Sequence, residues 1–248
     1  ITAEKDAGEE FFKGSQKQGF DFYSAHAFFK GGKYLRSFAL GDYQVQVGQG
    51  LNLWSSYAFG KTADLTTMKR TAIPIRAYTS VDESRFLRGA AADFAFRNWS
   101  LLVFASQKKL DGSSSLDSTY DDLEFVSTID LSGLHRTTNE IAKKNGLTER
   151  IFGGNVRYQL GAFHWGAAYV YQAYDKPFNK PIQLYNQFVF RGTSQQSISS
   201  DYSYVFRNIH VFGEVSKVLR TDLEPIKGWA MVHAAMLSLD PRFSVGLL

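Results

Sequence analysis

Apolar and polar residues alternate with a period of two along much of the chain, which is the pattern of β-strands that have two different faces. Between residues 43 and 54, apolar side chains occupy mainly the odd positions, and Gln, Gly and Asn occupy most of the even ones. Residues 152–161 follow the same rule, and so do residues 163–172 after a turn at Gly161–Ala162. Each stretch therefore predicts a strand with one apolar face and one polar or small face.

The predicted strands are long. Further strands are predicted at residues 20–29, 34–42, 86–97, 100–108, 120–131, 185–190, 203–206, 208–220 and 228–237. Several approach the roughly 9–11 residues that a tilted strand needs to cross a bilayer, whereas strands of soluble proteins most often have about 5–6. Aromatic residues, 15% of the chain, gather near strand ends, for example at Trp54, Trp99, Tyr169 and Trp229.

Short and long connections alternate between these strands. Tight turns are predicted at residues 30–33, 97–99 and 161–162, and long connections at residues 55–85, 109–119, 132–149 and 175–184. This alternation is typical of outer-membrane barrels. The sequence thus predicts an all-β fold, an antiparallel transmembrane β-barrel of about ten to twelve strands. The barrel would occupy residues 1–248 as one domain, alone or as part of a larger barrel.

A soluble antiparallel sandwich or lipocalin-like barrel is the alternative, because periodicity does not say which face points outward. In the membrane interpretation the apolar side chains face lipid and their neighbours face the lumen. The predicted lipid-facing residues are Val45, Val47, Leu51, Val156, Tyr158, Leu160, Trp165 and Tyr169. The candidates for the lumen or pore are Arg36, Gln44, Gln46, Asn52, Arg88, Arg136, Asn155, Arg157, Gln159, His164 and Glu214. These polar residues either line an open channel or pair with one another and fill the lumen.

One long connection carries a predicted helix. Thr137 and Glu140 have the spacing of a capping box, and Gly146 is a suitable residue to end the helix, which places it near residues 137–145. Two arrangements of this loop remain open. It either folds into the lumen, where Arg136 adds a fixed positive charge, or stays outside as a rigid surface feature.

Composition removes several classes of function. The formal net charge of +4 is small and dispersed, which argues against a dedicated nucleic-acid module with a dense basic face. The chain has no cysteine, so disulfides, thiolate metal sites and a cysteine nucleophile are excluded. Its five histidines form no recognised metal motif, and no G-x-S-x-G motif is present. We therefore expect no cofactor, no metal site and no enzymatic activity. No apolar run reaches the length of a transmembrane helix.

Several short strings in fixed order carry a family resemblance. They are EKDAGE at 4–9, GFDFYSAH at 19–26, LGDY at 40–43, GQGL at 48–51, FGK at 59–61, SRFLRG at 84–89, SGLHRT at 132–137, FGE at 212–214 and GWA at 228–230. With this set the chain resembles, over nearly its whole length, the outer-membrane barrel portion of Bacteroidota proteins that often carry an N-terminal helix-hairpin-helix region.

The resemblance implies a location in the outer membrane and a chain that is a segment of a longer protein. Membrane lipid and lipopolysaccharide would be its surroundings, with other envelope proteins as partners. The expected function is a channel or a component of envelope transport or assembly. Helix-hairpin-helix regions bind nucleic acid, so a DNA-uptake pore is an alternative, and an outer-membrane enzyme or a soluble ligand-binding β-sandwich are further ones. Conductance, salt-dependent DNA retention and detergent partition separate these functions.

Overall fold

A computed structural model describes residues 1–58, 67–117, 123–179, 183–187, 189–221, 228–240 and 243–248. Nearly all regular structure in these residues is β-strand, which confirms the all-β prediction. The strands are β1 (Thr2–Glu4), β2 (Phe22–Ser24), β3 (His26–Lys30), β4 (Leu35–Val45), β5 (Ile75–Ala77), β6 (Leu87–Phe96), β7 (Trp99–Asp117), β8 (Leu123–Asp130), β9 (Leu147–Leu160), β10 (Phe163–Phe178), β11 (Gly192–Phe206), β12 (Ile209–Thr221), β13 (Trp229–Asp240) and β14 (Phe243–Leu247).

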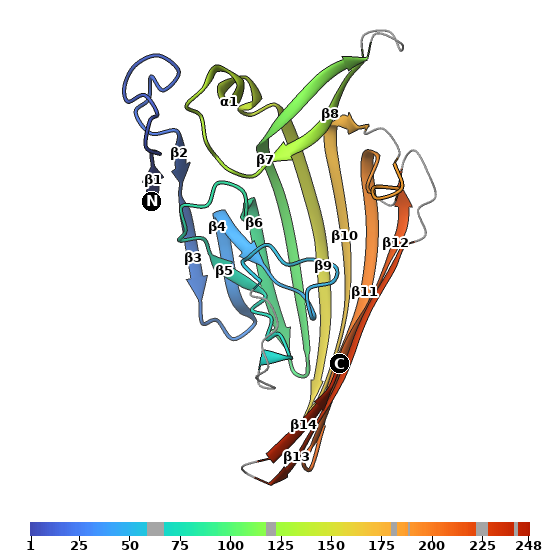
Figure 1. Cartoon of the computed structure of the whole chain (residues 1–248). Coiled ribbons are helices and arrows are strands. Elements are labelled where there is room, and N and C mark those ends of the chain that lie inside the picture. Colours follow the sequence, from blue (N-terminus) through green and yellow to red (C-terminus); the bar gives the residue numbers. More distant parts are fainter. Residues whose placement is uncertain (59–66, 118–122, 180–182, 188, 222–227, 241–242) are drawn as a thin grey trace.

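Twelve of these strands form one sheet, and β1 and β2 pair separately. Neighbouring strands pair antiparallel in the order β3, β4, β6, β7, β9, β10, β11, β12, β13 and β14. β8 pairs with β7 and makes one parallel bridge to β10, which closes a ring through β9. In the described part of the chain, β3 and β14 are not paired with each other. The long strands run together as one curved sheet (Figure 1).

The short turns after β3, β6, β9 and β11 lie at one end of the sheet, and the connection that carries α1 lies at the other, which we call the hairpin-turn end and the long-connection end (Figure 1). The predicted turns at residues 30–33, 97–99 and 161–162 are confirmed, and Arg97 and Gly161 adopt the positive φ that such tight turns require. A further hairpin at Arg207–Asn208 joins β11 and β12, and Arg207 there also has a positive φ of 54°.

The largest error of the sequence interpretation concerns residues 43–54. β4 ends at Val45, and the chain then turns through Gly48 and Gly50, whose φ values are 54° and 86°. Val45 and Val47 were predicted to face lipid. They are instead 0% and 1% exposed, in a core with side chains of β7, β9 and β10. The prediction was wrong because a Gly at every second position looks like the small face of a strand.

Other boundaries also differ from the prediction: β11 begins at Gly192 rather than at residue 203, and β9 begins at Leu147, within the predicted connection 132–149. Residues 109–119 were predicted to be a connection, but β7 continues through them as far as Asp117. Leu110 and Gly112 keep the alternation there, and Leu110 packs with Val126 and Leu147. The strand predicted at residues 185–190 is absent from its described part, where turns replace it.

The predicted helix exists as α1 (Thr138–Lys143), and its capping box is confirmed. The Thr137 hydroxyl accepts a hydrogen bond from the Glu140 backbone N–H, and the Glu140 carboxylate accepts one from the Thr137 N–H. The predicted end at Gly146 is wrong, because Asn145 takes the left-handed conformation, with φ 54°. The structure describes no helix that is long and apolar enough to cross a membrane.

The two faces of the sheet differ sharply. We call the inner face the one that bears Ala39, Ala91, Leu102, Ile151 and Ala168, which are buried in one cluster. The opposite, outer face is apolar and exposed. Its exposed members include Phe96, Trp99, Leu101, Val103, Phe152, Val156, Leu160, Phe163, Tyr169, Ile198, Tyr204, Phe206, Trp229 and Met231. Monomeric soluble proteins rarely expose continuous apolar patches of more than a few hundred Å².

Tyr43 fixes the packing of β4 against β6 and β7. Its side chain is fully buried, and the carbonyl oxygens of Ala90 and Ala105 share the single proton of its hydroxyl, at 3.1 and 2.7 Å. Removing the hydroxyl leaves those buried acceptors with fewer partners.

We expect Tyr43→Phe to lower the free energy of unfolding by about 1–3 kcal/mol, the usual range for a lost buried hydrogen bond. Tyr169→Phe removes an exposed hydroxyl that bonds to Gln196, and serves as the control with a change near zero. Urea unfolding in detergent micelles measures both. Equal effects of the two substitutions would contradict the assigned role of Tyr43.

Candidate functional site: the occupied inner face

The chain that follows β4 returns across the inner face of the sheet. We call residues 46–58 and 67–74 the inserted segment. Figure 1 shows the chain after β4 in front of the long strands rather than beside them. Val47 and the partly buried Leu53 pack against the cluster that contains Leu102, Ile151 and Val170. The polar side chains of the same segment bond to β11 and β12, so it contacts the sheet from β7 to β12.

Glu214 of β12 anchors the nearer half of the inserted segment. Its side chain is 0% exposed, and Oε2 accepts backbone N–H bonds from Gln49 at 2.7 Å and Leu51 at 3.0 Å. Next to this anchor, the Ser197 hydroxyl of β11 donates to Asn52 Oδ1 at 2.6 Å. A buried carboxylate needs such donors, because burial without them costs several kcal/mol.

Gly48 is required for this contact. A Cβ built on Gly48 would lie 2.7–2.9 Å from the carboxyl atoms of Glu214, and the backbone there has a positive φ. Both observations explain a glycine at this position: the left-handed conformation disfavours other residues, and the carboxylate needs the space.

Lys69 anchors the farther half. Its Nζ donates to the Ser203 hydroxyl of β11 at 2.8 Å and lies 3.4 Å from His210 Nε2 of β12. The Ser203 hydroxyl is also 2.8 Å from His210 Nε2. This serine–histidine pair was not marked by the sequence. Among the described residues no carboxylate bonds to the other ring nitrogen of His210, so the third member of a hydrolase triad is missing.

A polar cavity of about 420 Å³ remains between the inserted segment and the hairpin-turn end of β9, β10 and β11. Charged groups from both sides line it, among them Lys69, Arg70, Arg157, His164 and Asp201. His164 Nε2 is 3.1 Å from Asp201 Oδ1, and Arg157 pairs with Asp93 of β6. The cavity can therefore accommodate water, ions or a small polar solute, and the inserted segment covers the neighbouring part of the inner face between β7 and β12.

Several of the predicted lumen residues lie at this cavity or next to the inserted segment. Those in the cavity lining are Gln46, Asn155, Arg157, Gln159 and His164, and those that bond to or within the inserted segment are Gln44, Gln46, Asn52 and Glu214. The spacing of two along β9 correctly grouped Asn155 with Arg157. The sequence missed Lys69, Ser203 and Asp201, because strand alternation alone does not show which side chains a distant loop contacts.

The remaining candidates lie elsewhere. Arg88 forms a two-pronged ion pair with Asp42, at 2.6 and 2.8 Å, on the face opposite Tyr43, and also donates to the Tyr23 carbonyl of β2. Arg36 is exposed near the start of β4. Arg136 is bound to Glu140 at 3.3 Å beside α1 and is not part of the cavity lining. The segment that occupies the inner face is therefore the inserted segment, residues 46–58 and 67–74, and not the helix-bearing loop.

No protein-family model, no curated protein and no solved structure matches this chain.

Gly48→Ala should detach the inserted segment, since the new methyl group meets the Glu214 carboxylate. Gly161→Ala is a matched control, because Gly161 has nearly the same φ of 55° but nothing lies within 4 Å of a Cβ there. Both variants bear the backbone cost of about 1–2 kcal/mol. Only Gly48→Ala should increase proteolysis within residues 46–58. Similar proteolysis of both variants would show that Glu214 does not hold the segment.

Proposed function

We propose that this chain forms the wall of an outer-membrane β-barrel that serves transport across the envelope. In this proposal the inserted segment closes the lumen of the barrel. The observation that carries the proposal is that the outer face is apolar and exposed although the inner face is already filled. Large apolar side chains cover the outer face, whereas the apolar cluster around Leu102 and Ile151, charged and polar side chains and the inserted segment occupy the inner face. A soluble sandwich or lipocalin-like barrel keeps its large apolar side chains inside and presents a more polar surface to solvent.

The dimensions of the apolar band support this proposal. On β9 the outward side chains run from Leu160 to Phe152, about 26 Å along the strand. A tilt of about 40° reduces this to a height of roughly 20 Å, against about 25 Å in known membrane barrels. Trp99, Tyr158 and Phe163 lie at the hairpin-turn end of the band, as an aromatic girdle does, and the exposed Arg150 follows at the other end.

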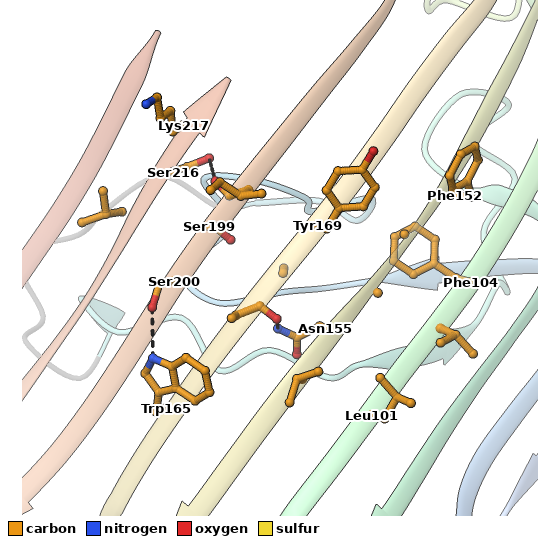
Figure 2. Close-up of a pocket in the computed structure, with 18 of the residues that line it drawn as sticks. Leu101, Phe104, Phe152, Asn155, Trp165, Tyr169, Ser199, Ser200, Ser216 and Lys217 are labelled. Carbon is orange, nitrogen blue, oxygen red and sulfur yellow. Dashed lines mark hydrogen bonds between the residues drawn. The ribbon is translucent and has the colours of Figure 1, made fainter. Parts of the chain in front are cut away.

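A depression on the outer face has a shape that suits lipid. Figure 2 shows Leu101, Phe152, Trp165 and Tyr169 around it. Its volume is about 850 Å³, and Gly154, Ala167 and Ser200 form part of its lining. The small residues leave room between the large ones, and the Trp165 indole N–H is satisfied by the Ser200 hydroxyl at 3.1 Å. An acyl chain that fills this depression would contact mainly apolar side chains.

Closure by the inserted segment can be tested with a crosslink. The chain contains no cysteine, so Asn52→Cys/Ser197→Cys introduces one thiol pair at a contact between the segment and β11. We expect planar-bilayer conductance to be lower with the pair crosslinked than with it reduced. Ser238→Cys/Ser244→Cys, a contact between β13 and β14 at 3.2 Å, is the control and should show no such difference.

Conductance that is the same in the crosslinked and reduced states of the first pair would contradict a movable closing segment. A complete lack of conductance in both states would contradict the transport function itself. The crosslink is verified by mass spectrometry, so a negative result is not a failure of the chemistry.

Charged substitutions on β9 test which face of this strand meets lipid. Val156→Arg should destabilise the protein in lipid vesicles by about 2–4 kcal/mol, because it places a charge within the apolar band. Gln159→Arg changes an exposed residue on the other face of the same strand and should have a much smaller effect. Equal losses of stability in refolding titrations would contradict a lipid-facing outer surface.

A further inference from the structure

A buried polar cluster lies at the long-connection end of the sheet, apart from the inner cavity. Its members come from three distant parts of the sequence: Glu9 and Asp21 from the N-terminal segment, Asp111 from β7, and His135 from the loop before α1. The side chains of Glu9, Asp21 and His135 are 0%, 1% and 2% exposed. Strand pairing in the main sheet does not bring these side chains together, because Glu9 and Asp21 precede β3, where the N-terminal segment joins that sheet.

Three of these side chains have the geometry of a cation site. One ligand atom each from Glu9, Asp21 and His135 lies within 4.8 Å of the others. His135 Nδ1 is 2.9 Å from Asp21 Oδ2 and 3.9 Å from Glu9 Oε1. A small movement of the side chains toward a common centre would give the 2.0–2.2 Å ligand distances of a zinc site.

Two further observations point to a ligand. Asp21 Oδ1 is buried and has no hydrogen-bond partner, so this carboxylate has an unused oxygen beside the other two ligands. His135 Nε2 is 2.7 Å from Asp111 Oδ2. A metal-binding histidine typically donates its second ring N–H to a carboxylate, which fixes the ring orientation and raises the basicity of the ligand.

The local charge favours a divalent cation. Glu9, Asp21 and Asp111 supply three carboxylates around one imidazole, and Glu83 lies in the lining of the adjoining cavity of about 250 Å³. Lys144 donates to the Asp21 carbonyl oxygen at 3.4 Å, and Arg88 and Lys109 are the other basic residues in the lining of that cavity. Burial of this much negative charge is unfavourable unless cations compensate it.

We propose that Glu9, Asp21 and His135 bind a divalent transition-metal ion of the Zn²⁺ type, with Asp111 as the residue that positions the imidazole. The imidazole nitrogen selects such an ion over Ca²⁺ and Mg²⁺, which prefer oxygen ligands alone. The ion joins the N-terminal segment to the helix-bearing loop, so it stabilises one end of the barrel wall. This inference does not depend on the transport proposal.

A proton is the competitor for Nδ1. Burial alone lowers the pKa of His135, but the hydrogen bonds to Asp111 and Asp21 outweigh it and raise the pKa to about 9. A protonated imidazole that only bridges two carboxylates is therefore the alternative that the experiment must separate from metal binding.

The experiment is a Zn²⁺ titration of the purified protein after removal of metals with a chelator. Calorimetry and elemental analysis should give one Zn²⁺ per chain. Glu9→Gln and Asp21→Asn should each weaken binding more than tenfold, and Asp111→Asn should weaken it about 10–100-fold as an outer-shell change. Glu10→Gln, next to Glu9 but half-buried and bonded to Ser15, is the matched control and should bind as the wild type does.

Proteolysis gives an independent readout. Zn²⁺ should slow trypsin cleavage after the exposed Lys13 and Lys17 in the wild type and in Glu10→Gln, but not in Glu9→Gln. A visible absorption spectrum of the Co²⁺-substituted wild type tests the site even where a variant fails to fold. A wild type that binds neither ion, or unchanged binding in Glu9→Gln and Asp21→Asn, would overturn the proposal and leave a bridging imidazolium.

Discussion

The buried carboxylate of Glu214 connects the two sides of the curved sheet. It accepts two backbone N–H bonds from a turn that begins only a few residues after β4. β4 and β12 are six strand positions apart in the sheet, which is about 29 Å in a flat arrangement. The four residue-to-residue steps from Val45 to Gln49 span at most about 14 Å. The sheet must therefore curl toward the inserted segment for the contact to form.

The other features of the inner face follow from this curvature. Once the turn at Gly48 reaches β12, Val45 and Val47 are placed against the aliphatic side chains of β7, β9 and β10. Lys69 is then close enough to bond to Ser203. Some of the remaining polar side chains pair with one another at the cavity, as His164 of β10 does with Asp201 of the neighbouring strand β11. The outer face contributes little to this network, so its exposed apolar surface needs another environment.

The hairpins and the helix cap could be predicted from the sequence because each depends only on residues that are close together in the chain. Gly161 and Arg97 each occupy a tight turn, and Thr137 precedes Glu140 by three residues. Alternation also grouped Asn155 with Arg157 correctly. It failed at residues 46–54 because Gly48 and Gly50 satisfy a period of two while forming turns. It also could not bring Glu9, Asp21 and His135 together, since only the tertiary fold places those segments side by side.

The four tryptophans allow the most direct test of the assignment of the two faces. Trp165 lies on the outer face, whereas Trp54 belongs to the inserted segment, where Arg70 stacks on its ring at 5.4 Å. Proteins that retain only one of these tryptophans can be placed in vesicles of brominated lipid, which quenches fluorescence on contact. Strong quenching of Trp165 with little quenching of Trp54 is the predicted result. Equal quenching of both, or stronger quenching of Trp54, would contradict it.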